Sequence, residues 1–389
     1  MKRSPSFREL LESLEGSFGD RCRRHGAGPL ATVLPASVEE VVSLARAARR
    51  YSVALHPSGA EMDPDLSPPE GEVILVSTRM LRAVRFPDEE RRRVEVGPGV
   101  LWLELENELH TVHRALPVYP TSAPRTTVGG WLARDGVGVG SFACGWLGEN
   151  VLSVRVVTPE GHLRTLEGAQ VRSVIGALGK TGVIVQATLR LRETTGDRPF
   201  AAVFERASDL QRAVVSLLEQ RPPLWHLGFA NPPMAETLGV RGRYLLFGAS
   251  LGGGAEPEDL LARILAGNRG RSLDVAEAYR VWGSRFFPAD PSRPTPSPGR
   301  VLVPASRAGG VLEHAGAAPV RLAVLGSVSR DGSALLLAFA VSGKRLASLG
   351  AGDEAGLVGA ARSAGGELYH EVLRRRAVRD YTDGSERPE

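Results

Sequence analysis

The sequence predicts an α+β fold divided into two domains. The chain has 389 residues, which is more than one hydrophobic core usually holds and suits two domains of roughly 150 to 200 residues each. Runs with helical spacing of apolar residues alternate with short β-rich runs in both halves. A stretch at residues 193–199 separates the halves, and a strand, helix and strand pattern begins again after it. This restart predicts the second domain.

The first half opens with a surface helix and a βαβ-like unit. Apolar spacing predicts the helix at 7–18, and Ser37 is the expected N-cap of a second helix, which leads to a strand at 53–55. Further β-rich segments lie at 72–77, 82–86 and 93–96, and a helix is expected at 101–110. The turn Pro159-Glu160-Gly161 predicts a hairpin. An alternating strand then closes the first domain near Leu191.

The second half also mixes strands and helices. Its expected strands lie at 201–204, 224–230, 323–328 and 334–340, and its expected helices at 208–218 and 257–266. The tail after residue 379 is expected to be disordered. We therefore place an N-terminal helix and lead-in at 1–28, the first domain at 29–192, the second domain at 199–378 and a flexible tail at 379–389.

Composition narrows the classes of function. Apolar residues make up 42% and charged residues 24%, as in ordinary globular proteins, and no apolar run is long enough to cross a bilayer. The net charge is +4, but the arginines are scattered and lack the interleaved aromatic residues of a nucleic-acid surface. The N-terminus has no apolar signal core. We expect a cytoplasmic protein with no transmembrane segment and no nucleic-acid partner. Any association with a membrane would go through partner proteins.

Cysteine and histidine positions give no sign of a metal site. Cys22 and Cys144 lie in different contexts without a CxxC or histidine-paired spacing. The histidines also lack partners at ligand spacing. We expect no metal and no disulfide framework.

The segment 127–145 reads TVGGWLARDGVGVGSFACG and contains six glycines without a low-complexity repeat. Glycine has no Cβ and tolerates positive φ, so such a segment brings backbone N–H groups close to a large polar ligand. The loss of conformational entropy is a cost that a purely structural loop seldom bears six times. The segment is therefore predicted to be a ligand-binding loop.

Five motifs in one order resemble the FAD-linked oxidases, the group that includes vanillyl-alcohol oxidase, D-lactate dehydrogenases and the bacterial glycolate oxidase subunits. The motifs are PASVEEV at 35–41, VEVGPGV at 94–100, the glycine-rich segment at 127–145, VVTPEG at 156–161 and GALGKTGVI at 176–184. Each motif alone is weak, but five in family order over one domain are hard to obtain by chance. The resemblance covers about residues 30–192.

The resemblance implies a two-lobed PCMH-type FAD-binding domain followed by a smaller α+β, ferredoxin-like cap that faces the substrate. In the family, backbone N–H groups hold the FAD pyrophosphate, and the isoalloxazine lies at the junction with the cap. The residues that the resemblance places at the cofactor are Ser58, Gly59, Thr127, Val128, Gly129, Gly130, Gly138, Ser141, Gly182, Val183 and Ile184. No histidine follows the pyrophosphate loop where some members attach flavin, so FAD is expected to be non-covalent.

The pyrophosphate loop departs from the family pattern. The family has Pro-Arg-Gly-Gly-Gly-Thr-Ser where residues 57–63 read PSGAEMD. Glu61 stands at a glycine position, and Met62 and Asp63 replace two hydroxyl residues. Carboxylates that point at a pyrophosphate would repel it.

Two functions remain open. The resemblance implies an FAD-dependent oxidoreductase of a small alcohol or 2-hydroxy acid such as glycolate or lactate. The short second domain resembles the accessory flavin subunit of bacterial glycolate oxidase more than its long subunit, which implies a sister flavoprotein and an iron–sulfur subunit as partners. The alternative is a flavin-free relative that acts as a structural or regulatory subunit, which Glu61, Met62 and Asp63 favour. The retained glycines favour the oxidoreductase.

No catalytic residue is assigned from the sequence. The cap motif of the lactate and glycolate branch is rich in histidine, whereas residues 326–332 read GSVSRDG. His370 and Glu371 form either an acid/base pair near the flavin or a solvated pair on a terminal helix.

Overall fold

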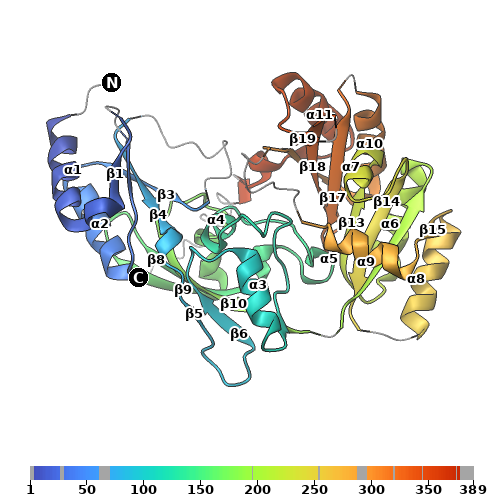
Figure 1. The fold of residues 1–389 in the computed structure, drawn as a ribbon, viewed down its shortest axis with the longest axis horizontal. Helices are drawn as coiled ribbons and strands as arrows, with labels where there is room; N and C mark the ends of the chain where they lie inside the picture. The colour runs from blue at the N-terminus through green and yellow to red at the C-terminus, as the bar shows by residue number, and fades with distance from the viewer. Residues whose placement is uncertain are drawn as a thin grey trace, which may run out of the picture.

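The computed structural model describes residues 4–26, 30–60, 71–194, 196–252, 255–286, 296–318, 320–343, 345–373 and 375–376. In Figure 1 the first half of the chain, from blue to green, lies beside the second half, from yellow to red. Each half mixes helices with its own sheets, which confirms the α+β fold in two domains. The boundaries of the two domains stay a prediction.

A small sheet and two helices form the N-terminal lobe. The strand order is β1 (Cys22–Arg24), β2 (Leu30–Val33), β4 (Val73–Ser77) and β3 (Ala54–Ser58), and β4 pairs in parallel with both β2 and β3. Helices α1 (Pro5–Phe18) and α2 (Val38–Arg50) bury their apolar faces against this sheet. The Ser37 hydroxyl accepts a hydrogen bond from the Glu40 N–H, which confirms the predicted N-cap.

The second lobe is built on a five-stranded antiparallel sheet within the described residues. Its order is β5 (Val84–Arg85), β6 (Arg93–Val96), β10 (Val183–Arg190), β8 (Val151–Val157) and β9 (Leu163–Glu167). Strands β8 and β9 form the predicted hairpin, with Val157 opposite Leu163. Helix α3 (Trp102–His110) packs on the core of this lobe, and β7 (Arg114–Ala115) pairs with β11 (Arg192–Glu193). Short 3₁₀ helices join elements of the first domain: η1 (Gly19–Arg21), η3 (Thr78–Met80), η4 (Leu147–Asn150) and η5 (Gly168–Ser173).

The glycine-rich segment is less irregular than a loop. It contains two short helices, α4 (Val128–Leu132) and α5 (Ser141–Cys144). The Thr127 hydroxyl caps α4 by accepting a hydrogen bond from the Gly130 N–H at 3.2 Å. A Cβ on Gly129 would lie 2.5 Å from the Pro98 Cβ, so this helix packs where a larger residue would clash. The expectation of a loop did not include this N-cap, although a threonine directly before a helix is a common N-cap residue.

The second domain is one antiparallel sheet with helices on its faces. Along the sheet lie β15 (Arg271–Ser272), β12 (Arg198–Phe204), β14 (Tyr244–Ser250), β13 (Leu224–Ala230), β17 (Leu322–Val328), β18 (Ser333–Ser342), β16 (Gly299–Pro304) and β20 (Glu367–Leu368), and β19 (Arg345–Ala347) pairs with β18. The helical segments are α6 (Ala207–Gln220), α7 (Pro232–Thr237), α8 (Ala255–Gly267), α9 (Val275–Gly283), η6 (Ala305–Arg307), α10 (Ala308–Ala317) and α11 (Ala351–Ser363). Strands β14 and β16 were not predicted. The segment 379–389 lies outside the described residues. Of the helices in the described ranges, none combines the length and the apolar character that a bilayer crossing needs.

Two buried side chains of β13 join the domains. The Trp225 Nε1–H donates a hydrogen bond to the Pro117 carbonyl at 2.8 Å, and the Gly140 N–H donates to His226 Nδ1 at 3.4 Å. His226 is 1% exposed and packs against Phe247 and Trp282. Burial lowers the pKa of His226 to about 3, and the positive charge of Arg285 adds to this effect. The imidazole is therefore neutral and accepts at Nδ1.

We expect acid to destabilise the protein through His226. Below pH 6.5 the unfolded chain protonates this residue and the folded chain does not, so stability is present above that pH and is lost as pH falls. Between pH 7.5 and 5.5 the loss should be about 1.4 kcal/mol in the free energy of unfolding. His226→Asn retains an acceptor near Nδ1 and should lose this contribution, as measured by urea unfolding at both pH values. The exposed His162→Asn is the control, and equal pH dependence in the wild type and His226→Asn would contradict the expectation.

Candidate functional site

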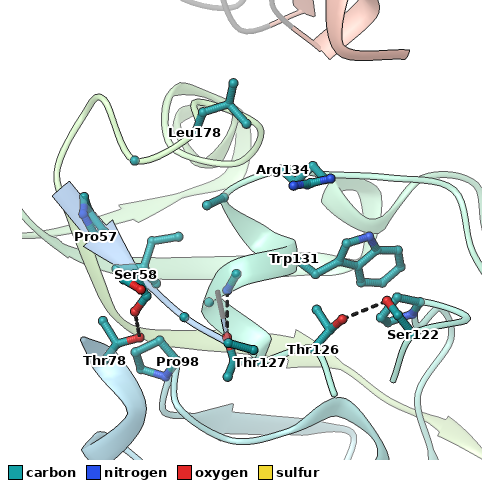
Figure 2. A pocket seen from close by; sticks show the side chains of 18 of the residues that line it. Pro57, Ser58, Thr78, Pro98, Ser122, Thr126, Thr127, Trp131, Arg134 and Leu178 are labelled. Carbon is teal, nitrogen blue, oxygen red and sulfur yellow. Dashed lines mark hydrogen bonds between the residues drawn. The ribbon is translucent and has the colours of Figure 1, made fainter. Parts of the chain in front are cut away.

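A cavity of about 440 Å³ lies between the first domain and the sheet of the second. This volume is within the range of small-molecule and cofactor sites. The first domain contributes the end of β3, the start of α4 and the turn before β10, whereas the second contributes Arg300, Leu335, Leu337 and Tyr369. Figure 2 shows the part of the lining that comes from the first domain. The cavity therefore lies where two domains meet, a common place for ligand sites.

Backbone atoms of β3 and α4 meet at one end of the cavity. A Cβ on Gly59 would lie 2.5 Å from the Thr127 hydroxyl oxygen, so only glycine permits this approach. The Thr78 hydroxyl donates to the Ser58 carbonyl at 3.3 Å, as drawn in Figure 2, and Arg79 Nε donates to the Gly59 carbonyl at 3.0 Å. These bonds fix the backbone before the predicted pyrophosphate loop. Residues 61–63, including Glu61, Met62 and Asp63, lie outside the described residues.

The structure brings most of the sequence-predicted site residues to this cavity. Those that line it are Ser58, Gly59, Thr127, Gly129, Gly130, Gly182 and Ile184. The N–H groups of Gly129 and Gly130 already donate, to the Pro98 carbonyl at 2.9 Å and to the Thr127 hydroxyl. Gly129 and Gly130 therefore contribute to the cavity by having no side chain, which leaves space for a ligand. The binding role of these residues stays a prediction.

Val128, Gly138, Ser141 and Val183 lie away from the cavity lining. Val128 packs in the core of the second lobe, and Val183 packs in that of the N-terminal lobe. Side chains alternate along β10, so Ile184 faces the cavity while Val183 faces the other way. The Ser141 hydroxyl accepts from the Gly138 N–H at 2.9 Å, and its carbonyl accepts from the Arg330 N–H of the second domain. Gly138 and Ser141 therefore support the junction between the two domains.

Thr181 is a lining residue that the sequence interpretation missed. Its hydroxyl oxygen is buried and has no hydrogen-bond partner among the described residues. An unsatisfied buried hydroxyl costs about 1–3 kcal/mol, and a ligand that bonds to it would remove this cost. Thr181 lies inside the motif GALGKTGVI, so this motif already contained a hydroxyl residue that could bind a ligand.

Arg134, Arg300 and Tyr369 also line the cavity and were not predicted. Burial, followed by the positive charge of Arg300, lowers the pKa of Arg134 to about 9. The Tyr369 ring stacks on Trp146, its hydroxyl donates to the Asp135 carbonyl at 3.4 Å, and burial raises its pKa. No sequence motif contains these three residues together, because they are far apart along the chain.

His370 and Glu371 do not line the cavity. The Glu371 carboxylate forms an ion pair with Arg362 at 3.7 Å instead. The neighbouring Tyr369 takes the place at the cavity. The arrangement matches a solvated pair more closely than an acid/base pair at the site.

The cavity fits the cofactor that the resemblance implies. A glycine at position 59 leaves room that a Cβ would fill, and the Thr181 hydroxyl offers an unused hydrogen bond. The guanidinium groups of Arg134 and Arg300 provide positive charge. Polar groups of these kinds, set among apolar side chains, suit a large ligand with anionic and aromatic parts.

Comparisons with known proteins agree with this fit. Residues 29–167 match the family model of an FAD binding domain. The mitochondrial D-lactate dehydrogenase (cytochrome) of Arabidopsis thaliana is 28% identical over 217 residues, which cover 49% of this chain and 38% of that protein. D-2-hydroxyglutarate dehydrogenase of Xanthomonas citri pathovar viticola is 30% identical over 202 residues, which cover 49% of this chain and 43% of that protein. The matches thus span less than half the length of these curated relatives.

A solved structure extends the similarity in fold to both domains. The 4-ethylphenol oxidase from Gulosibacter chungangensis superposes with a TM-score of 0.74 at 15% identity, over 98% of this chain and 92% of that chain. Residues 29–167 therefore form an FAD binding domain, and the cofactor of this chain is FAD.

Proposed function

We propose that this chain is an FAD-dependent oxidoreductase of a small alcohol or a 2-hydroxy acid such as glycolate or lactate. The observation that carries the proposal is one cavity shared by the FAD binding domain and residues of the second domain. FAD bound there would supply the chemistry of hydride acceptance. The relatives named for D-lactate and D-2-hydroxyglutarate dehydrogenation support a 2-hydroxy acid as the substrate class.

The chain's own residues would hold and shield the cofactor. Ser58, Gly59 and Thr181 present polar groups on the first-domain side, and Thr181 has a hydroxyl ready to bond. The apolar side chains of Ile184, Leu335 and Leu337 would exclude water. We propose non-covalent FAD, because no histidine follows Gly59 in the pyrophosphate loop.

We also propose that the chain works as an accessory subunit with a sister flavoprotein and an iron–sulfur subunit. This proposal rests on the short second domain, which resembles the accessory flavin subunit of bacterial glycolate oxidase more than its long subunit. Affinity purification of the tagged chain from its own cells tests it, with the iron and flavin content of the eluate as the readout. A chain that purifies alone at every salt concentration would contradict it.

The central test is reduction of bound flavin by candidate substrates. The purified protein should show flavin absorption in the visible, either as isolated or after addition of FAD. Anaerobic addition of glycolate, lactate or a primary alcohol should bleach that absorption. Bound flavin that none of these compounds bleaches would refute the oxidoreductase. A protein that takes up no FAD would favour the structural or regulatory alternative.

Gly130→Leu should release FAD. A Cβ at Gly130 meets only the Thr127 hydroxyl, at 3.0 Å, so a longer side chain would extend into the open cavity. We expect FAD affinity to fall by about tenfold or more, which corresponds to about 1.4 kcal/mol. Fluorescence titration with FAD measures this. Gly16→Leu on α1 is the matched control, because a Cβ there meets nothing within 4 Å. Equal affinity in both variants would rule out the role of Gly130.

Thr181→Val should weaken FAD binding without harming the FAD-free protein. The change keeps the shape and removes a buried hydroxyl that has no partner among the described residues. Loss of a neutral hydrogen bond to the ligand predicts roughly a two- to tenfold weaker affinity. The melting temperature without FAD should stay the same or rise. The exposed Thr165→Val on β9 is the control, and an FAD affinity that matches the control would argue against contact with Thr181.

A further inference from the structure

We propose that Trp131 and Tyr369 together bind the hydroxyl group of the substrate. This inference rests on the proposed function and deepens it, because it names the group that the chain recognises on an alcohol or a 2-hydroxy acid. Trp131 belongs to α4 of the first domain, and Tyr369 follows β20 of the second. Both side chains line the cavity that the two domains share.

The indole ring of Trp131 is held in one orientation by its surroundings. It lies edge-on to the ring of Trp102, with 5.2 Å between the ring centroids and 90° between the ring planes. A Cβ on Gly136 would lie 2.8 Å from Trp131 Nε1, and a Cβ on Gly138 would lie 3.1 Å from its Cη2. These two glycines of the glycine-rich segment therefore leave room for the indole. Packing on both sides fixes the direction of its N–H group.

The indole N–H of Trp131 is an unused donor at the cavity. The neighbouring Trp102 Nε1–H donates to the Thr127 carbonyl at 3.2 Å, whereas the Trp131 N–H has no hydrogen-bond partner within the part of the chain that the structure describes. Trp131 is only 7% exposed and lines the cavity. A donor that is largely removed from water and unpaired is costly, and a ligand in the cavity can supply its acceptor.

The Tyr369 hydroxyl supplies an acceptor close to this donor. A Cβ on Gly136 would lie 2.9 Å from the hydroxyl oxygen, so this oxygen and Trp131 Nε1 flank the same glycine. The hydroxyl donates to the Asp135 carbonyl at 3.4 Å, and it stays protonated because burial raises its pKa. A backbone hydrogen bond from Val137 uses one lone pair of the oxygen, which leaves a second lone pair for a ligand.

A donor beside an acceptor is the arrangement that recognises a hydroxyl group. The oxygen of a hydroxyl accepts from the indole N–H and its proton goes to the phenol oxygen, whereas a carbonyl oxygen only accepts. In the proposed reaction the alcohol is the substrate and the carbonyl compound is the product. The pair therefore binds substrate more tightly than product. Neither side chain carries a charge, so this recognition applies to simple alcohols and to 2-hydroxy acids alike.

The position of the pair favours the substrate over the hydroxyl groups of FAD itself. In Figure 2 the ring of Trp131 extends away from Ser58 and Thr78, at the end of the cavity where β3 meets α4. Tyr369 comes from the second domain and packs with Leu335 of β18, which also lines the cavity. A small ligand held by the pair would contact this apolar side chain of the second domain.

The test compares Trp131→Phe and Tyr369→Phe, which keep an aromatic ring and remove the polar atom, with the exposed control Tyr279→Phe on α9. The probes are 2-hydroxyisobutyrate, which has no hydrogen on its carbinol carbon to transfer, and isobutyrate, which lacks the hydroxyl. Both are titrated into the FAD-loaded protein and followed by flavin absorbance. The wild type and the control should prefer 2-hydroxyisobutyrate by about tenfold, and each cavity variant should reduce this preference about two- to tenfold.

Two results would overturn the proposal directly. One is a wild type that shows no preference between the two compounds, a result that needs no variant and so holds even where a variant fails to fold. The other is a preference in both cavity variants that equals that of Tyr279→Phe. A lower melting temperature with an unchanged preference would assign these side chains to packing alone and would lead to the same conclusion.

FAD affinity distinguishes a hydroxyl of the substrate from a hydroxyl of the cofactor. We expect Trp131→Phe and Tyr369→Phe to change FAD affinity by less than twofold, as measured by fluorescence titration. If FAD affinity falls tenfold or more while the preference for 2-hydroxyisobutyrate is unchanged, the pair binds a hydroxyl group of FAD and the proposal is wrong.

The results also separate this inference from the proposed function. If lactate or a primary alcohol bleaches the flavin and the preference for 2-hydroxyisobutyrate survives in both variants, the oxidoreductase stands and the hydroxyl site fails. If no compound bleaches the flavin but the preference depends on Trp131 and Tyr369, the hydroxyl site stands and the oxidoreductase fails.

Discussion

The close approach of Gly59 to Thr127 is the contact on which the cavity depends. A Cβ on Gly59 would lie 2.5 Å from the Thr127 hydroxyl oxygen, so the N-terminal lobe meets the second lobe here only through a glycine. The same hydroxyl accepts from the Gly130 N–H and caps α4. One threonine therefore begins the helix and defines one end of the site. The glycines contribute by leaving space, whereas Thr181 contributes the unused donor.

The second domain completes the cavity because β13 holds it in place. Trp225 bonds to the Pro117 carbonyl and His226 accepts from the Gly140 N–H, so both contacts reach the segments that surround the site. These side chains are buried, and their hydrogen bonds have little competition from water. A fixed junction is what places Arg300, on a distant strand of the same sheet, at the cavity that the first domain also lines.

Local features of the fold were predictable from the sequence, whereas the composition of the site was only partly so. Ser37 and the β8–β9 turn are short-range signals, and both appear as expected. Strand β16 carries a terminal proline, Pro304, and follows a proline-rich stretch, so its strand pattern was obscured. Val183 and Ile184 differ only in the direction in which β10 points them, and a motif cannot show that direction. Arg134, Arg300 and Tyr369 meet only through tertiary structure.

A ligand that contacts both domains would act on more than its own binding site. Thr181 in the first domain and Tyr369 in the second both line the cavity, so a ligand that fills it would add contacts across the junction. Any ligand that binds the folded protein stabilises it by mass action, and here that stabilisation is directed at the contact between domains. Ligand binding and the contact between the domains are therefore linked through the lining that both domains share.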